Sequence, residues 1–184
     1  ALHLPGFGHG HDHGHTDLAT DQALFDNEIG IRTVWLALLL LGITTVLQIA
    51  IYLVSGSVAL LADTVHNLGD ALNSIPLLIA FYLARRVANR RYTYGFGRAE
   101  DIAGVLIVVS IAFSAGYILI ESFQKLIDPQ PLTNLPWVGA AALIGFVGNE
   151  LVAMMQIRVG KQIGSDAMVA DGQHARVDGL TSLA

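Results

Sequence analysis

Hydrophobic and polar positions alternate along this chain in long blocks rather than residue by residue. Four apolar runs each hold about the 20 residues that a helix needs to cross the hydrocarbon core of a bilayer. They lie at 34–53, 58–84, 102–120 and 135–157, and a fifth begins near Met168 and continues to Ala184. The pattern predicts an all-α membrane protein, a helical bundle with five spans, rather than a buried bundle in a soluble protein.

Composition and charge placement support the membrane assignment and orient the chain. Hydrophobic residues make up 53% of the sequence and charged residues only 14%, whereas soluble domains are about 25% charged. The basic residues are Arg85, Arg86, Arg90, Arg91 and Arg98 after the second run, and Arg158 and Lys161 after the fourth. The positive-inside rule places both connections, and therefore the N-terminus, in the cytosol. A net charge of −5 gives no reason to expect a nucleic-acid partner.

The first 32 residues differ from the rest. We predict that residues 1–32 are a cytosolic tail and that residues 33–184 are a transmembrane domain. The tail carries four alternating histidines, His9, His11, His13 and His15. Such a tract can collect divalent metals loosely, although a solvated tail or a tag remnant remains the alternative. Because residue 1 is not Met and the last apolar segment is unfinished at Ala184, we expect the chain to be part of a longer protein.

Two predicted spans repeat one pattern of ionisable residues, Asp-x-x-His-x-x-x-Asp. Its members are Asp63, His66 and Asp70 in the second span and Asp171, His174 and Asp178 in the fifth. This spacing places all three residues of a span on one helix face. A single such residue is explained by a packing hydrogen bond, but six ionisable groups at membrane depth require a cation or water. We therefore predict a metal site formed by His66, Asp70, His174 and Asp178.

The chemistry of these four ligands bounds the metal and the activity. Two imidazoles and two carboxylates suit tetrahedral Zn²⁺, with Co²⁺ or Cd²⁺ as substitutes, and leave Fe²⁺ and Ni²⁺ open. We expect hydrogen bonds from four nearby side chains to orient the ligands. These are Asp63, Asn73, Asn149 and Asp171. For Asn149, and for Glu150 beside it, an interhelical hydrogen bond is an equally good explanation.

An enzyme is not expected. The chain has no His-Glu-x-x-His, and four protein ligands leave no open position for a substrate at a catalytic zinc. Three transport or binding functions fit the pattern: an antiporter, a passive divalent-metal channel, and a membrane metal sensor. In an antiporter, protons and metal would compete for the same lone pairs, because a metal-binding His must be neutral.

The chain resembles the membrane domain of the cation diffusion facilitator family, proton-coupled exporters of zinc and related divalent metals. The resemblance is carried by His66-x-x-x-Asp70, by Tyr94-Gly-Phe-Gly-Arg-Ala-Glu100, by Asp128-Pro129 and by 165–178. It implies metal export through His66, Asp70, His174 and Asp178 in exchange for protons, across a bacterial inner membrane. It also implies a homodimer, a sixth span and a cytosolic C-terminal domain. The sixth span and the C-terminal domain would lie outside these residues.

Overall fold

The computed structural model describes residues 14–56, 58–85, 98–127 and 134–183, with the side chains of some of them left out. The described residues form five α-helices and no strand, which confirms the predicted all-α class. The helices are α1 (Gly14–Ser55), α2 (Val58–Ala84), α3 (Ala99–Ile127), α4 (Leu135–Ile163) and α5 (Asp166–Ser182).

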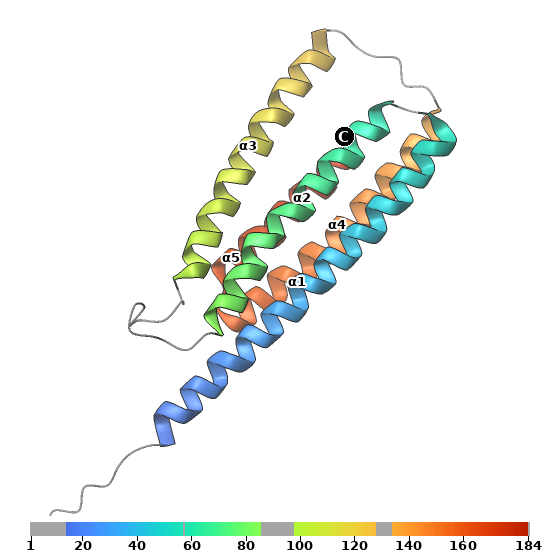
Figure 1. The fold of residues 1–184 in the computed structure, drawn as a ribbon. Coiled ribbons are helices and arrows are strands. Elements are labelled where there is room, and N and C mark those ends of the chain that lie inside the picture. Colours follow the sequence, from blue (N-terminus) through green and yellow to red (C-terminus); the bar gives the residue numbers. More distant parts are fainter. Residues whose placement is uncertain (1–13, 57, 86–97, 128–133, 184) are drawn as a thin grey trace, which may run out of the picture.

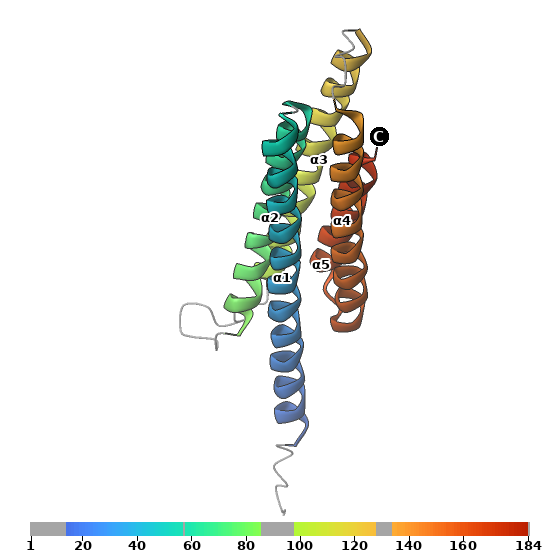
Figure 2. The same cartoon turned by 90° about the vertical axis from the view of Figure 1, so that its right-hand side faces the viewer.

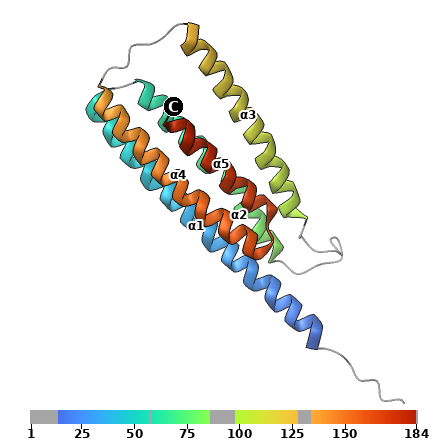
Figure 3. The same ribbon diagram turned by 180° about the vertical axis from the view of Figure 1, so that it is seen from behind.

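Four of the helices run side by side, and the fifth lies outside them (Figures 1 and 3). Helix α1 packs against both α2 and α4, while α5 packs along α4 and also contacts α2 and α3. Helix α3 is held mainly near its beginning, where Ala103 and Ile107 are buried, and it leans away from the bundle toward its other end (Figure 1).

One end of the bundle gathers the connections that carry basic residues. Here α2 ends, α3 begins and α4 turns back into α5, as Figure 1 shows. We call this the basic end, because Arg85 and Arg98 flank the α2–α3 connection and Lys161 lies in the last turn of α4. Helix α1 continues beyond the basic end as a single projecting helix (Figure 2).

Four helices are long and apolar enough to cross a membrane, which confirms the first four predicted spans. Within the described residues, the candidate membrane spans are Gln22–Ser55, Thr64–Ala84, Ala99–Gln124 and Leu135–Ile163. The predicted fifth span is a helix, α5, but it is not among these four. It carries several ionisable residues, which lower its hydropathy.

Helix α1 begins much earlier than the apolar pattern indicates. It starts at Gly14, inside the predicted tail, rather than near the first apolar residues at 34. The added segment is polar, so periodic hydrophobicity does not reveal it. It is supported by side-chain pairs one turn apart: Gln22 Nε2 donates to Asp26 Oδ1 at 3.0 Å, and Arg32 pairs with Glu28 at 2.9 Å. Such pairs stabilise helices that lack tertiary contacts.

A sharp turn folds α5 back onto α4. Gly164 ends α4 in the left-handed conformation (φ 69°), which glycine adopts without steric cost. Ser165 then caps α5, accepting a hydrogen bond from the Met168 amide. The two helices can approach closely because glycines lie between them. A Cβ at Gly172 would lie 2.9 Å from Gln156 Cβ and 3.0 Å from the backbone nitrogen of Ile157.

Replacing Gly172 with Ala is therefore expected to push α5 away from α4 and to destabilise the protein by about 1–3 kcal/mol, the usual cost of overpacking. Thermal unfolding in detergent measures the effect. Gly116→Ala is the matched control, since a Cβ there meets no described atom within 4 Å and alanine is the better helix former. Equal midpoints for the two variants would contradict a close α4–α5 contact at Gly172.

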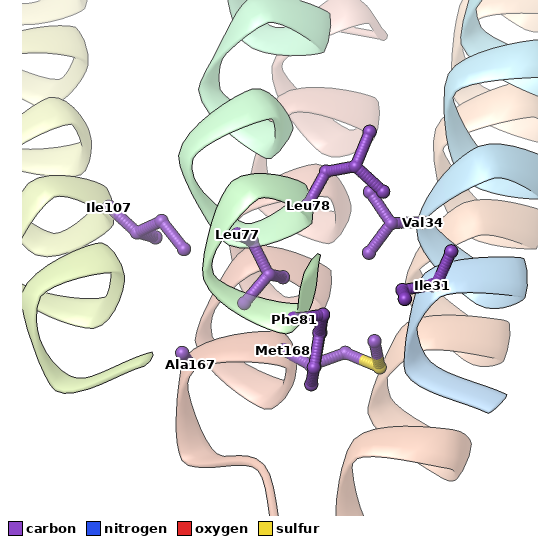
Figure 4. Close-up of a cluster of buried hydrophobic side chains, with 8 residues drawn as sticks. All are labelled: Ile31, Val34, Leu77, Leu78, Phe81, Ile107, Ala167 and Met168. Atoms are coloured by element: carbon purple, nitrogen blue, oxygen red, sulfur yellow. The ribbon is translucent and has the colours of Figure 1, made fainter. Parts of the chain in front are cut away.

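An apolar cluster closes the bundle near the basic end (Figure 4). Its buried members come from four helices: Ile31, Val34, Leu77, Leu78, Phe81, Ile107, Ala167 and Met168. Phe81 and Met168 are 2% and 0% exposed. The Phe81 ring lies against Gly30 of α1, where a Cβ would come within 2.9 Å of ring carbons. This cluster lies between the candidate site residues of α2 and α5 and the basic end.

Candidate metal centre

Helices α2 and α5 bring three of the four predicted ligands together. Asp178 lies between the two imidazoles: its Oδ1 is 3.8 Å from His66 Nε2, and its Oδ2 is 3.3 Å from His174 Nδ1. The side chains of His174 and Asp178 are only 4% and 2% exposed, whereas that of His66 is 23% exposed. Two histidines from different helices therefore converge on one buried carboxylate.

The fourth predicted ligand, Asp70, lies on α2 one turn after His66, but its side chain is outside the described part, as is that of Asp63. Within the part that the structure describes, no group of three or more His, Asp or Glu side chains is arranged to hold a metal ion. The four-ligand site therefore stays a prediction. The tail histidines His9, His11 and His13 lie before the first described residue, and the side chain of His15 is also left out.

The face of α5 follows from its spacing. Met168, Asp171, His174 and Asp178 recur every three or four residues and are all buried, as expected for one side of a helix. Arg176 and Val177 between them are exposed. Burying two carboxylates and an imidazole on a single stripe is costly unless polar partners face them, so the neighbouring helices are expected to supply such partners.

Asp171 finds its partners on two other helices. Its Oδ2 accepts hydrogen bonds from Ser74 Oγ of α2 and from Gln156 Nε2 of α4, each at 2.7 Å. Hydrogen bonds to a carboxylate are shorter and stronger than those between neutral groups. This layer lies one turn from His174 toward the basic end and joins α2, α4 and α5. An orienting effect of Asp171 on His174 stays a prediction.

Asn149 is buried beside His174 and Asp178. It is 2% exposed, and its Nδ2 makes no hydrogen bond to any described residue. Together with His174, Asp178 and Asp171 it lines a small cavity of about 10 Å³ that α4 and α5 form with α1 and α2, close to the space that one water molecule requires. The amide is thus placed beside two predicted ligands with a donor to spare.

A second polar layer lies beside His66 and joins α1, α2 and α4. Asn67, next to His66, donates to Gln48 Oε1 of α1 at 2.8 Å, and Gln48 Nε2 donates to the Ala141 carbonyl of α4 at 3.4 Å. Gln48 and Asn67 are 0% and 3% exposed. Two hydrogen-bonded layers, each of which joins three helices, therefore lie next to the cluster of His66, His174 and Asp178.

The remaining predicted residues have partners elsewhere. Asn73 accepts a hydrogen bond from Ser110 Oγ of α3 at 2.7 Å. Glu150 makes an interhelical hydrogen bond, as one of the two expectations for it proposed. Arg176 Nε and Nη2 of α5 donate to its two carboxylate oxygens at 3.1 and 2.8 Å. This bidentate pair ties α5 to α4 on the side away from the site.

Sequence reasoning missed Gln48, Asn67, Ser74 and Gln156. A signal was present, because each is a polar side chain inside an apolar run, and Ser74 follows Asp70 by one helical turn. The sequence alone does not show which residue each of these side chains bonds to. The hydrogen bonds of Gln48 and Gln156 join residues 93 and 15 positions apart, so only the packing of the helices reveals them.

The donor set of the cluster can compete for protons and for metal. Its three described side chains offer imidazole nitrogen and carboxylate oxygen, the ligands that suit Zn²⁺ and similar ions. Each of these atoms can bind either a proton or a metal ion, but not both at once.

Comparison with known proteins identifies the family. Residues 34–184 match the model of the cation efflux transmembrane domain. A probable cation efflux system protein of Mycobacterium tuberculosis is 53% identical over 95% of this chain and 52% of its own length. Zinc transporter ZitB of Pectobacterium atrosepticum is 30% identical over 94% of the chain and 50% of its own length.

A third relative carries a different metal in its name. The manganese efflux system protein MneP of Bacillus subtilis is 29% identical over 72% of this chain and 44% of its own length. The chain thus spans about half the length of the curated relatives it matches. Because the match to the transmembrane domain covers nearly all of the helical bundle, the chain belongs to the cation diffusion facilitator family.

Proposed function

We propose that this protein is a transporter rather than an enzyme, and that it exports divalent metal cations, Zn²⁺ first, in exchange for protons. The observation that carries the proposal is the position of Asp178, which lies within 3.8 Å of an imidazole nitrogen from α2 and within 3.3 Å of one from α5. Asp70, one turn from His66, is proposed as the fourth ligand.

The choice of zinc rests on the nitrogen ligands. Two imidazoles with two carboxylates favour Zn²⁺, Co²⁺ or Cd²⁺, whereas Mn²⁺ prefers oxygen ligands and higher coordination. The similar proteins include one named for zinc and one named for manganese, so family membership alone does not choose between them. His66 and His174 are the residues of this chain that favour zinc.

Proton exchange would follow from competition for the ligand atoms. Zinc binding requires neutral histidines and ionised aspartates, so binding releases protons and protonation releases metal. We place the basic end and the N-terminus in the cytosol on the strength of the arginines. Metal would then enter from the basic end after the apolar cluster around Phe81 and Met168 opens, and it would leave past the layer of Gln48 and Asn67.

The ligands would be oriented by the polar side chains around them. Asn149 can donate to a ligand carboxylate, and Asp171, held by Ser74 and Gln156, stands one turn from His174. Asp63 and Asn73 on α2 complete the proposed set. Fixing ligands in this way is a general requirement of metal sites, and loss of such a partner typically costs about 10–100-fold in affinity or activity.

Flux into sealed vesicles tests the function directly. The intact protein is reconstituted, and zinc uptake is followed with and without an imposed pH gradient. An antiporter is expected to accumulate zinc in the compartment that starts more acidic, and dissipating the gradient with an ionophore should stop the accumulation. Equal flux with and without the gradient would identify a passive channel, and binding without flux would identify a sensor.

The metal preference provides a separate prediction. Replacing His66 with Asp is expected to broaden selectivity toward Mn²⁺ and Cd²⁺, because an oxygen replaces a nitrogen among the ligands. Competition of each metal with zinc uptake in vesicles measures the preference. His66→Gln, which supplies a neutral amide without adding charge, separates the effect of the ligand atom from that of charge. An unchanged preference in His66→Asp would place selectivity outside this residue.

A further inference from the structure

We propose that the cavity between α4 and α5 contains a second, weaker cation position, formed by Asp171 and Gln156, at which a divalent cation stops on its way between the basic end and the histidine site. The inference rests on the proposed function, because it assigns a step to the same pathway. It concerns a different set of ligand atoms, however, and can therefore fail separately.

The cavity connects the two positions. It is lined by Asn149, His174 and Asp178 together with Gln156, Asp171 and Ser74. Its volume of about 10 Å³ leaves room for about one water-sized particle between the histidine cluster and Asp171.

Asp171 brings a buried carboxylate into this space. It is 4% exposed, and the donors to its Oδ2 are the neutral groups of Ser74 and Gln156. Among the ion pairs formed by described residues, none joins Asp171 to a Lys or an Arg. An ionised carboxylate buried without a cation is costly. A passing divalent cation would supply the missing positive charge.

Two of the residues that line the cavity each have one amide atom without a partner among the described residues. Gln156 Oε1 and Asn149 Nδ2 are both buried, and neither makes a hydrogen bond within the described part of the chain. Buried polar atoms without partners are rare in folded proteins and call for an explanation. An acceptor beside the Asp171 carboxylate suits a cation, and a free donor farther along suits the oxygen of a water that accompanies it.

The ligand chemistry makes this position weak. Carboxylate, amide and hydroxyl oxygens bind divalent ions without the preference for zinc that imidazole gives, and ions bound in this way usually keep some of their water. Such a position would let the ion exchange its water in stages. The location of this position fits the role. Leu77 and Met168 of the apolar cluster lie three residues from Ser74 and from Asp171, respectively, so the position is in the first polar layer beyond the apolar cluster.

Cobalt titration tests the proposal, because Co²⁺ bound by tetrahedral nitrogen and oxygen ligands absorbs strongly in the visible, whereas oxygen-rich sites of higher coordination absorb weakly. The protein is used at full length with its four tail histidines changed to Gln, so that the tail does not bind cobalt. We expect two equivalents, the first with the intense band and a weaker second one without it. Equilibrium dialysis counts both.

Asp171→Asn should remove the second equivalent, since the amide keeps an acceptor for Ser74 and Gln156 but loses the charge. The intense band of the first equivalent should persist at an affinity about 10–100-fold lower, as expected for loss of an orienting residue. Asp166→Asn is the matched control: it removes an exposed carboxylate from the same helix and should leave both equivalents. If Asp171→Asn does not fold, Gln156→Met, which removes Oε1 with little change in size, should weaken the second equivalent instead.

A single equivalent in the parent protein would overturn the second position, as would a second equivalent that survives Asp171→Asn or is lost equally in Asp166→Asn. Failure of the proposed function looks different. In that case the intense first band is absent, or it persists in Asp178→Asn, whatever happens to the second equivalent.

Discussion

Asp178→Ala is expected to abolish metal transport while leaving the protein folded. Asp178 lies between both imidazoles and is 2% exposed, so its loss removes a ligand and also the group that holds the two histidines in register. Loss of a residue that only orients a ligand costs about 10–100-fold, so loss of a ligand should lower zinc flux by at least about 100-fold. Flux into vesicles measures this.

The control must separate loss of the site from loss of the fold. Asp166→Ala removes an exposed carboxylate from the first turn of the same helix and should transport normally. Both variants should elute and unfold like the parent protein, because truncating Asp178 does not uncover apolar surface. Zinc uptake near the parent level in a folded Asp178→Ala protein would rule out Asp178 as a ligand.

The helices could be predicted largely from the chain because lipid imposes a simple rule. A span must satisfy its backbone internally over about 20 apolar residues, so α2, α3 and α4 could be read from length and hydropathy alone. The start of α1 at Gly14 could not. Its polar first half projects beyond the bundle and is stabilised by local pairs such as Glu28–Arg32, which leave no apolar periodicity.

The site could be predicted within each helix but not between helices. The spacing of Asp171, His174 and Asp178 placed them on one face, and all three are buried. Which groups face them depends on how the helices pack. Asp171 is bonded to Ser74 and Gln156 of two other helices, and neither partner stands at a spacing that points to it.

Glu150 shows the same limit. An interhelical hydrogen bond was one expectation for it, and the bidentate contact with Arg176 confirms that interpretation. Its partner depends on the left-handed Gly164 and the Ser165 cap, which reverse the chain and set α5 antiparallel to α4. Inserting or deleting one residue in that connection would rotate α5 by about 100° about its axis, and Arg176 would then no longer face Glu150. The partner is therefore a property of the turn.

Zinc affinity is expected to fall steadily as the pH drops through the range in which histidine titrates, near a pKa of about 6.5. Zinc binds neutral imidazole, so lower pH favours the protonated, metal-free protein, and each zinc bound should release more than one proton. Calorimetry of the purified protein in buffers of different ionisation enthalpy, over about pH 5.5 to 7.5, counts these protons. In the antiport mechanism this release is the coupling between the two gradients.

Removing both imidazoles tests whether the released protons come from the two histidines. The double variant His66→Asn, His174→Asn should bind zinc more weakly and with a flatter dependence on pH, because the remaining carboxylates are already ionised in this range. Parent and double variant are both measured with the four tail histidines replaced by Asn, so that zinc bound by the tail does not contribute released protons. If zinc binding releases no protons and flux into vesicles does not depend on pH, exchange is excluded, and the two histidines would serve a passive metal pathway.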